Sequence, residues 1–397
     1  MKNGIFRSTT LSLGTLIFLG TNLSVEALLA PRVSGGNAEV VARTLDEINP
    51  AAGTDLGNIV GILNGLSNAG LKVALNQMQP SLFNAMALSQ ENNSIRVSSA
   101  VDKRMEKLYL TDCTRDCSPN KRIAFWGDLF GDLAKQESIQ SQTGFHTSTG
   151  GGLVGMDYGC LSNFFVGANL AYTCSDVDFR SSAGSGHISS YYGGIYSTWF
   201  NELAYADASF IGAYNHYRAS RKIEFTGVDR RAKNQHNGGE FDARIEAGIF
   251  FPLKGLDLRP FDTLEYIYVH EGSFSEKGAR SLNLDVKAKT STLLRNELGL
   301  GAATCFTFNR WSLAPDVKLS WIREVRFGGG RTRAEFDDTD VSFGVNGMKP
   351  IRSLLGTGAG LTGLFLQERL AATVRYNGEF QEHYWDQNIN LQVSFAF

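Results

Sequence analysis

The strongest constraint on this fold is an alternation of apolar and polar residues with a period of two, which runs from about Lys121 to the end of the chain. It is clear in the last ten residues, "NINLQVSFAF", where Ile389 and every second residue after it are apolar. This is the period of a β-strand with one apolar and one polar face. About twelve such segments follow one another, and each has the roughly ten residues that a tilted strand needs to cross a bilayer. The pattern therefore predicts an all-β protein, either soluble or a membrane barrel.

The polar faces of these segments separate the two alternatives only in part. In a soluble sandwich they would be the solvated outer surface, whereas in a membrane barrel they would line a hydrated lumen. Two features favour the barrel: aromatic residues such as Trp311 and Trp321 stand toward segment ends, and the segments are longer than ordinary strands. We therefore expect these charged residues to line the lumen: Arg244, Glu246, Lys287, Lys289, Arg295, Glu297, Asp316, Lys318, Arg369 and Arg375.

The connections between the segments also alternate in length. Short links are expected at 161–163, 201–202, 253–256, 308–309 and 367–368, and long links at 133–147, 179–187, 218–237, 272–285 and 325–350. Outer-membrane barrels have short periplasmic turns and long outer loops. The sequence therefore predicts an up-and-down barrel of about 12 antiparallel strands in the outer membrane of a Gram-negative-type bacterium, surrounded by outer-membrane lipid and lipopolysaccharide, and a monomer.

The N-terminus has the features of a secretory signal peptide. Lys2 and Arg7 precede a short apolar run from Leu11 to Leu19, and small residues at the cleavage positions favour cleavage after Ala27. The alternative, an uncleaved anchor, is disfavoured because the run is well short of the ~20 residues of a membrane-spanning helix. We assign residues 1–27 to the signal peptide and expect export through the Sec translocon.

Residues 28–110 have a helical rather than a strand period. Apolar residues recur at helical spacing, as at Ile59, Ile62 and Leu63, and we expect two or three helices, the last from about Ser81 to Leu110. That last helix is rich in small and polar residues, which suits a solvated helix or one inside a polar channel. We assign 28–110 to a linker or pore helix with a vestigial passenger, and 111–397 to the barrel.

Charge and cysteine content exclude several other classes of protein. The formal net charge of −2 gives no electrostatic reason to expect nucleic acid as a partner. The five cysteines are too few and too scattered for a disulfide scaffold. Cys113 and Cys117 lie close enough to favour a local disulfide after export. Cys160, Cys174 and Cys305 fall in strand-like segments and are expected to be small packing residues.

No motif in the chain supports catalysis, a cofactor or a metal. The glycines of "GTGAGLTG" have nucleotide-motif spacing, but they sit in a β-rich region without the helix that such a site needs. Ser185 and His187 adjoin glycines in an expected outer loop, and the histidines are dispersed. A basic run, "ASRKIEFTGVDRRAKNQH", could contact lipopolysaccharide or a host polyanion, although a solvated outer loop is the preferred interpretation. We expect no enzymatic activity.

From about Lys121 onward the chain resembles the β-barrel translocator domain of autotransporters, the type V secretion proteins. The resemblance rests on short stretches in the family's order: "FWGDLFGD", "STGGGLVGMDYGC", "NFFVGANLAYTCSDVDF", "ISSYYGGIYSTWF", "LRNELGLGAA" and the last strand. The family's basic pair corresponds to Arg221 and Lys222, and its proline, tyrosine and Glu-x-Gly pattern to Pro260, Tyr266, Glu276 and Gly278. The resemblance extends back to "VDKRMEKLYL", which is similar to the end of the family's pore helix.

The resemblance implies a function and several partners. The barrel is expected to transport or anchor an N-terminal segment at the cell surface, and the barrel-assembly machinery to read the last strand through Phe397, Phe395 and Val393. In some members the linker is cleaved at an Asn-Asn pair, but Ser99 and Ala100 stand at those positions, so self-cleavage by that chemistry is not expected. Only residues 28 to about 70 remain for a passenger. The alternative is therefore a passenger-less barrel that serves as a channel, adhesin or structural surface protein.

Overall fold

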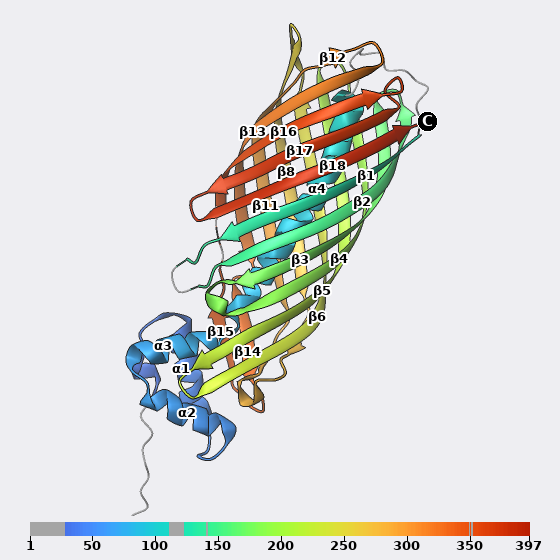
Figure 1. Cartoon of the computed structure of the whole chain (residues 1–397). Helices are drawn as coiled ribbons and strands as arrows, with labels where there is room; N and C mark the ends of the chain where they lie inside the picture. Colours follow the sequence, from blue (N-terminus) through green and yellow to red (C-terminus); the bar gives the residue numbers. More distant parts are fainter. Residues whose placement is uncertain (1–27, 111–122, 140–141, 349, 351) are drawn as a thin grey trace, which may run out of the picture.

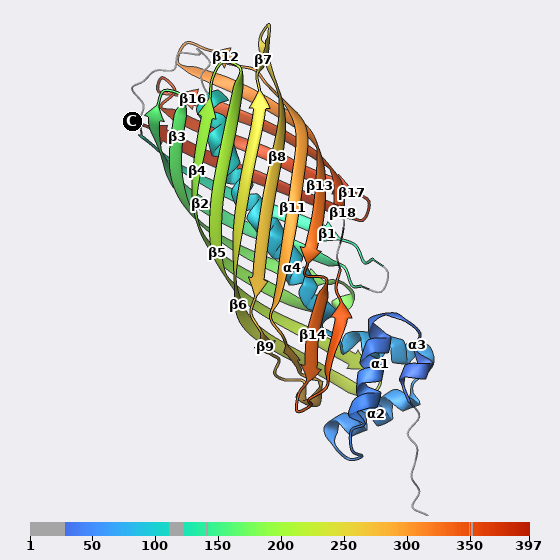
Figure 2. The same ribbon diagram turned by 180° about the vertical axis from the view of Figure 1, so that it is seen from behind.

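Twelve antiparallel strands form a closed barrel in the computed structural model of this chain, which describes residues 28–110, 123–139, 142–348, 350 and 352–397. The wall strands are β1 (Ile123–Gln136), β2 (Phe145–Leu161), β3 (Phe164–Phe179), β4 (Gly184–Phe200), β5 (Ala204–Phe225), β6 (Val228–Ile249), β8 (Leu256–Glu271), β11 (Lys289–Ala303), β13 (Trp311–Gly328), β16 (Arg352–Phe365), β17 (Leu370–Gln381) and β18 (Tyr384–Ala396). Each strand pairs with its neighbour, and β18 pairs with β1 (Figures 1 and 2). The prediction of an up-and-down barrel is confirmed.

The last strand closes the barrel with the faces that its alternation predicts. Phe395 lies opposite Phe125 and Leu391 opposite Leu129 across the β1–β18 seam. Ile389, Leu391 and Val393 are exposed on the outside of the barrel, whereas the asparagines and glutamine between them are buried in the lumen. Because side chains alternate across a pleated strand, this arrangement repeats around the wall and presents an apolar belt outward.

A single helix, α4 (Asn84–Leu110), runs through the barrel (Figure 2). The helix contains neither glycine nor proline, so nothing in its sequence interrupts it over 27 residues. It begins at one rim, directly after the short helix η2 (Pro80–Phe83), and ends near the rim that holds the C-terminus. Within the described residues, no helix is both long enough and apolar enough to cross a bilayer.

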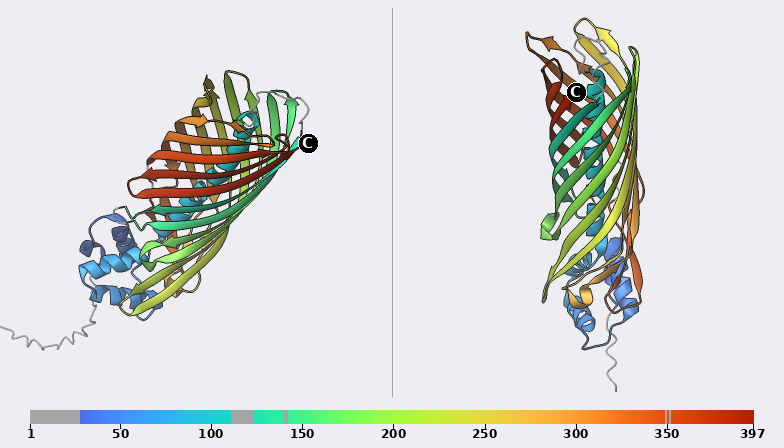
Figure 3. Two further views of the ribbon diagram at one scale, coloured as in Figure 1. Left: turned by 45° about the horizontal axis from the view of Figure 1, so that its top comes forward. Right: turned by 90° about the vertical axis from the view of Figure 1, so that its right-hand side faces the viewer.

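Three short helices cover the rim at which α4 begins (Figures 1 and 3). They are α1 (Gly36–Ile48), α2 (Asp55–Gly65) and α3 (Asn68–Gln77), preceded by the short helix η1 (Ala30–Arg32). The N-cap hydroxyls of Thr54 and Ser67 accept from the backbone N–H groups that open α2 and α3, which sets where these helices begin. Residues 28–83 are called the cap below.

The cap rests on an accessory sheet that is built from the outer connections of the barrel. Its strands are β9 (Phe274–Ser275), β10 (Leu284–Val286), β14 (Arg331–Phe336) and β15 (Ser342–Asn346), and the short helix η4 (Arg280–Leu282) lies between β9 and β10. Apolar residues from the cap, this sheet and the ends of β5 and β6 share one core, which includes Leu45, Leu75, Ile223 and Phe336. The cap therefore does not have a core of its own.

Two of the expected long loops are strands instead. Residues 179–187 include only a short helix, η3 (Arg180–Ser182), between β3 and β4, and residues 218–237 are the paired ends of β5 and β6 joined at Thr226 and Gly227. Gly227, at φ 81°, supplies the backbone conformation that this tight turn needs. The expectation of loops there is wrong because the shared core holds the inward face of the hairpin beyond the belt. At the opposite rim, the short strands β7 (Phe251–Leu253) and β12 (Phe306–Thr307) extend two of the short turns.

Candidate functional site: the plugged lumen

An apolar cluster, called the collar below, packs against the first turns of α4 on the side of β2–β5. Leu82, Met86 and Leu88 pack against wall residues from β2, β3, β4 and β5, among them Phe145 and Ile188. Gly186 faces this collar, because a Cβ there would meet the Met86 sulfur at 2.2 Å. This packing holds the side of the helix that faces β2–β5, whereas on the other side Glu91 lies 2.7 Å from Arg326 of β13.

Beyond the collar, toward the C-terminal end of α4, polar side chains of the helix hydrogen-bond to the wall. Asn93 Oδ1 accepts from the hydroxyls of Thr149 (3.1 Å) and Ser175 (3.0 Å). Gln90 donates to the Tyr192 hydroxyl at 2.9 Å and accepts from the Ser190 hydroxyl at 3.1 Å. These residues are buried, and an unpaired buried amide costs about 1–3 kcal/mol, so each contact favours this one position of the helix.

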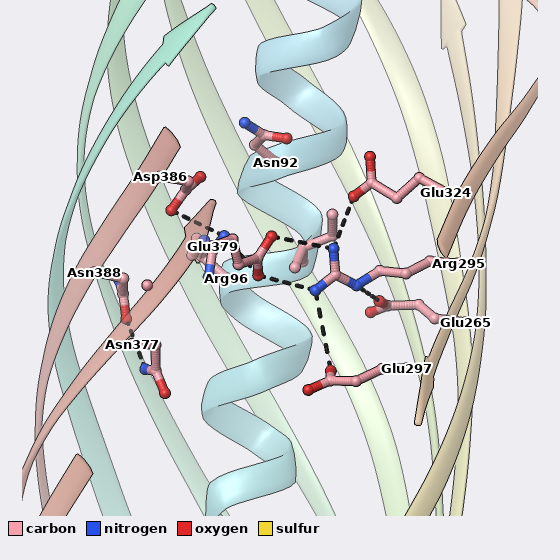
Figure 4. A network of polar contacts seen from close by, with 12 residues as sticks. Asn92, Arg96, Glu265, Arg295, Glu297, Glu324, Asn377, Glu379, Asp386 and Asn388 are labelled. Carbon is pink, nitrogen blue, oxygen red and sulfur yellow. Dashed lines mark hydrogen bonds and ion pairs between the residues drawn. The ribbon is translucent and has the colours of Figure 1, made fainter. Parts of the chain in front are cut away.

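Arg96 lies at the middle of the lumen and meets three carboxylates of the wall (Figure 4). Its Nε lies 3.0 Å from Asp132 Oδ1, and its Nη2 lies 3.0 Å from Asp386 Oδ1 and 3.2 Å from Glu379 Oε1. The guanidinium is 4% exposed, so these charges are shielded from bulk water. One helix residue thus bridges β1, β17 and β18.

Glu379 extends this cluster to the opposite wall. Arg295 donates to both of its carboxylate oxygens, at 3.2 and 2.9 Å, and also lies 2.7 Å from Glu324. Figure 4 shows Arg295 reaching across the lumen beside α4 toward Glu379. The helix cation therefore belongs to a network of alternating charges that includes β11, β13 and β17.

Further ion pairs hold the second half of α4. Arg104 Nε and Nη2 lie 2.7 and 2.9 Å from the two oxygens of Asp157. Glu106 accepts from Arg259 at 2.7 Å and lies 3.4 Å from Arg375. Two-point contacts of this kind fix orientation as well as distance.

Three carboxylates at this level, Asp102, Asp207 and Glu246, lie within 4.8 Å of one another, the spacing of a metal-binding group. Arg244 Nη2, however, approaches Asp102 at 3.2 Å and Glu246 at 3.0 Å. The arginine supplies the positive charge for this cluster, so we assign no metal here.

Most of the predicted lumen residues face α4. The structure places these in the lumen: Arg244, Glu246, Arg295, Glu297, Asp316, Lys318 and Arg375. Lys289 lies at the mouth, where its Nζ donates to the Phe83 carbonyl at 2.9 Å and lies 3.2 Å from Glu271. Asp132 and Asp386 also point into the lumen, as the even-numbered residues of β1 and β18 do, but they were not among the predicted residues.

Two of the predicted lumen residues lie elsewhere. Lys287 follows β10 in the accessory sheet, where it is exposed and pairs with Glu335 at 3.1 Å. Arg369 is an exposed residue of the turn between β16 and β17. In both cases the alternation was extended past the end of the strand, and beyond that end the parity of a position no longer says which face it takes.

The outer mouth is closed by contacts between the cap and the barrel. Asp55 of α2 accepts from both terminal nitrogens of Arg230 at 2.7 Å and from the Ser281 hydroxyl at 2.6 Å. The hydrogen bond from Arg230 lowers the pKa of the Asp55 carboxyl well below its ordinary value, and the Ser281 bond adds to this effect. Asp55 is therefore a stable anion at neutral pH.

Arg221 is the most enclosed of these contacts. Its side chain is fully buried; Nη2 lies 2.5 Å from Glu276, and Nη1 donates to the Gln77 carbonyl that ends α3 at 2.7 Å. The two short patterns that contain Arg221 and Glu276 are thus one ion pair in space, so the expectation of a solvated loop is wrong for Arg221. Ser185 and His187 likewise lie in strand β4, and His187 Nδ1 is 2.8 Å from Asp176.

The cysteines agree with the sequence interpretation only in part. Cys160 and Cys174 have free thiols. Cys305 is disulfide-bonded, which corrects the expectation that it is a packing residue. The expected pairing of Cys113 with Cys117 and the cleavage at Ala27 lie outside the described residues.

Comparison with known proteins decides the family. The model of the autotransporter beta-domain matches residues 125–377, well over half of the chain. The chain belongs to the autotransporter β-domain family. It is an outer-membrane β-barrel translocator domain, and such a domain is not itself catalytic.

Relatives and solved structures agree with this assignment. The chain is 24% identical to an extracellular serine protease of Serratia marcescens over 91% of its length and 22% identical to outer membrane protein A of Rickettsia conorii over 86%. The barrel is similar to the translocator domain of the autotransporter NalP from Neisseria meningitidis (TM-score 0.55, 17% identity, 76% of this chain and 98% of that one). It is also similar to the beta domain of the Bordetella autotransporter BrkA (TM-score 0.51, 17% identity, 70% of this chain and 100% of that one). The chain spans only 34% and 18% of the Serratia and Rickettsia relatives.

Proposed function

We propose that this translocator domain works as a closed anchor, which holds α4 in its lumen and displays the cap at the cell surface. The observation that carries the proposal is the continuous series of contacts along α4: the apolar collar, the Arg96 cluster and the Arg104–Asp157 pair follow one another down the lumen. A helix fixed at so many levels favours retention over passage. The sequence leaves residues 28 to about 70 for a vestigial passenger, and the proposal extends this segment to the whole cap, residues 28–83.

Surface labelling in intact cells tests where the cap lies. Lys72 is an exposed residue of α3, and Lys254 is exposed in a short turn at the opposite rim. A membrane-impermeant maleimide is expected to label Lys72→Cys without permeabilisation and Lys254→Cys only after it, in each case above the labelling of a parent protein without Cys160 and Cys174 that keeps the other three cysteines. Labelling of Lys254→Cys but not Lys72→Cys in intact cells would overturn the orientation and the display of the cap.

Conductance in planar bilayers separates the anchor from the channel alternative. Deleting the cap would expose the apolar face of the accessory sheet, so smaller changes are preferable. We expect the wild-type barrel to show no stable conductance, and Met86→Asp together with Leu88→Asp to open one by hydrating the collar. A wild-type protein that conducts steadily would favour the channel instead.

For the partners, we propose export through the Sec translocon and recognition of the last strand by the assembly machinery. The Phe397 N–H donates to the Ile123 carbonyl at 2.9 Å, and its ring meets those of Phe395 and Phe125 edge-on. Such a ring cluster at the rim supports a role for Phe397, Phe395 and Val393. Phe397→Ala should lower the amount of protein inserted in the outer membrane while export continues. Phe308→Ala, which removes an exposed ring from a neighbouring turn, is the matched control.

A further inference from the structure

The outward face of the β5–β6 hairpin carries basic side chains that have no acidic partner. Arg218 on β5, Arg231 and Lys233 on β6, and Lys277 beside β9 are all exposed, and none forms an ion pair with another residue in the described part of the chain. These four residues are called the basic ladder below. The inward-facing Arg221 and Arg230 of the same hairpin are, by contrast, both paired. The hairpin thus pairs its inward arginines, whereas among its outward cations only Lys222 has an acidic partner in the described part of the chain.

The backbone holds these cations close together. Lys233 and Lys277 lie directly opposite each other, joined by two N–H···O bonds of 2.8 Å between their backbones. Arg231 lies opposite Lys222, whose own partner is Glu224. Like charges placed directly opposite each other on neighbouring strands are destabilising. A rigid array of unpaired cations is therefore an arrangement that an anion would stabilise.

The ladder lies on the membrane side of the hairpin, above the apolar belt. Lys233 points outward like Phe241, and it comes eight residues before Phe241 on β6, roughly 26 Å along the strand toward the cap. Allowing for the tilt of the strand, this is roughly 20 Å beyond the belt. The ladder therefore faces the polar layer beside the barrel, beyond the hydrocarbon that the belt covers. An anionic membrane surface attracts each Lys or Arg that lies near it.

We propose that the basic ladder binds the phosphate groups of the glycolipid in the surrounding outer leaflet and so clamps the β5–β6 side of the barrel in the membrane. A soluble polyanion is the competing source of the same chemistry. The membrane is favoured because the ladder faces sideways along the barrel wall and not upward from the cap. This inference is independent of whether α4 seals the lumen.

Binding of lipopolysaccharide tests the proposal directly. The test variant is Arg231→Gln/Lys233→Gln/Lys277→Gln, and the matched control is Lys254→Gln/Arg310→Gln/Arg369→Gln, which removes three exposed basic residues from the opposite rim. Each protein is reconstituted in phosphatidylcholine nanodiscs with a small fraction of phosphorylated lipopolysaccharide, and the retained glycolipid is measured at low and high salt. Heat-modified gel mobility confirms that each barrel is folded.

The test variant is expected to lose about tenfold or more in binding, with a weaker salt dependence, while the control stays within about twofold of the wild type. Dephosphorylated lipopolysaccharide should bind the wild type as weakly as it binds the test variant. Equal binding by the test and control variants would overturn the proposal. So would wild-type binding that does not depend on the phosphates. Binding of soluble heparin in preference to the nanodisc glycolipid would assign the ladder to a soluble polyanion and overturn the membrane assignment.

Discussion

Replacing Arg96 by methionine tests whether the lumen is a dry, charge-paired interior. The change removes one cation from three carboxylates, but Glu379 keeps Arg295 at 2.9 Å. Asp132 and Asp386 have no other ion-pair partner among the described residues, so both are left buried without a cation. Breaking a buried pair in this way costs about 3–5 kcal/mol, whereas an exposed pair is worth about 0–1 kcal/mol. The magnitude of the loss therefore measures how well the lumen excludes water.

The measurement is unfolding of the reconstituted barrel in urea, followed by tryptophan fluorescence and by heat-modified gel mobility. We expect a lower midpoint for Arg96→Met at an unchanged slope, since the surface that unfolding exposes is similar. Arg369→Met, in an exposed turn, is the control and should leave the midpoint where it is.

A compensated variant separates the charge effect from a packing effect. Arg96→Met/Asp132→Asn/Asp386→Asn removes the orphaned charges with side chains of the same shape, and most of the lost stability should return. If Arg96→Met unfolds with the wild-type midpoint, or if the compensated variant is no better than the single one, the description of α4 as a charge-locked plug is wrong.

Three further predictions concern the rim and the lipid face. Arg221→Met should destabilise docking of the cap by about 3–5 kcal/mol, because it leaves Glu276 buried without its cation. Hydrogen exchange in α1–α3 should then rise, while exchange in the barrel wall should not. Because the folded-state pKa of Asp55 is depressed, its contribution is present at neutral pH and is lost as pH falls below about 4; cap protection should therefore be equal at pH 7 and 5 and lower at pH 3, and Asp55→Asn should abolish that difference. Asp262 is exposed on the outer face of β8, between Pro260 and Leu264, and accepts a hydrogen bond from Asn296 at 2.7 Å. Asp262→Leu should stabilise the reconstituted barrel by about 1–2 kcal/mol, because it removes a charge from the lipid-facing surface. An unchanged urea midpoint would contradict the place of Asp262 in the apolar belt.

Local alternation was sufficient to predict the barrel because the pleat ties each position to one face. The inward direction of Arg295 and Arg375 follows from this alternation alone, and the pairing of β18 with β1 follows from the closure of an up-and-down barrel. Parity carries no information about where a strand ends, which is why Lys287 and Arg369 were misplaced. The polar and small residues of α4 suited either a solvated helix or one inside a polar channel, and only the family resemblance favoured the pore.

The cap and the hairpin could not be predicted in the same way. The helical spacing of Ile59 and Leu63 shows that α2 buries one face, but it does not say which surface covers that face. The partners come from connections far away in the chain, as when Asn37 bonds to the backbone of Asn346, 309 residues later. Such contacts depend on tertiary arrangement and leave no periodic signal in the sequence.

The contacts of α4 also fix where the wall strands lie relative to one another along the barrel axis. Its side chains bond to eleven of the twelve wall strands, from β1 to β8 and on to β11, β13, β17 and β18. A strand that slipped by one residue would turn its lumen-facing partner toward lipid and break its bond to the helix. The helix thus acts as a ruler: its contacts fix the position of eleven wall strands along the barrel axis, and with it the stagger between these strands. A barrel assembled around this ruler would inherit its strand register from a segment that is not part of the sheet.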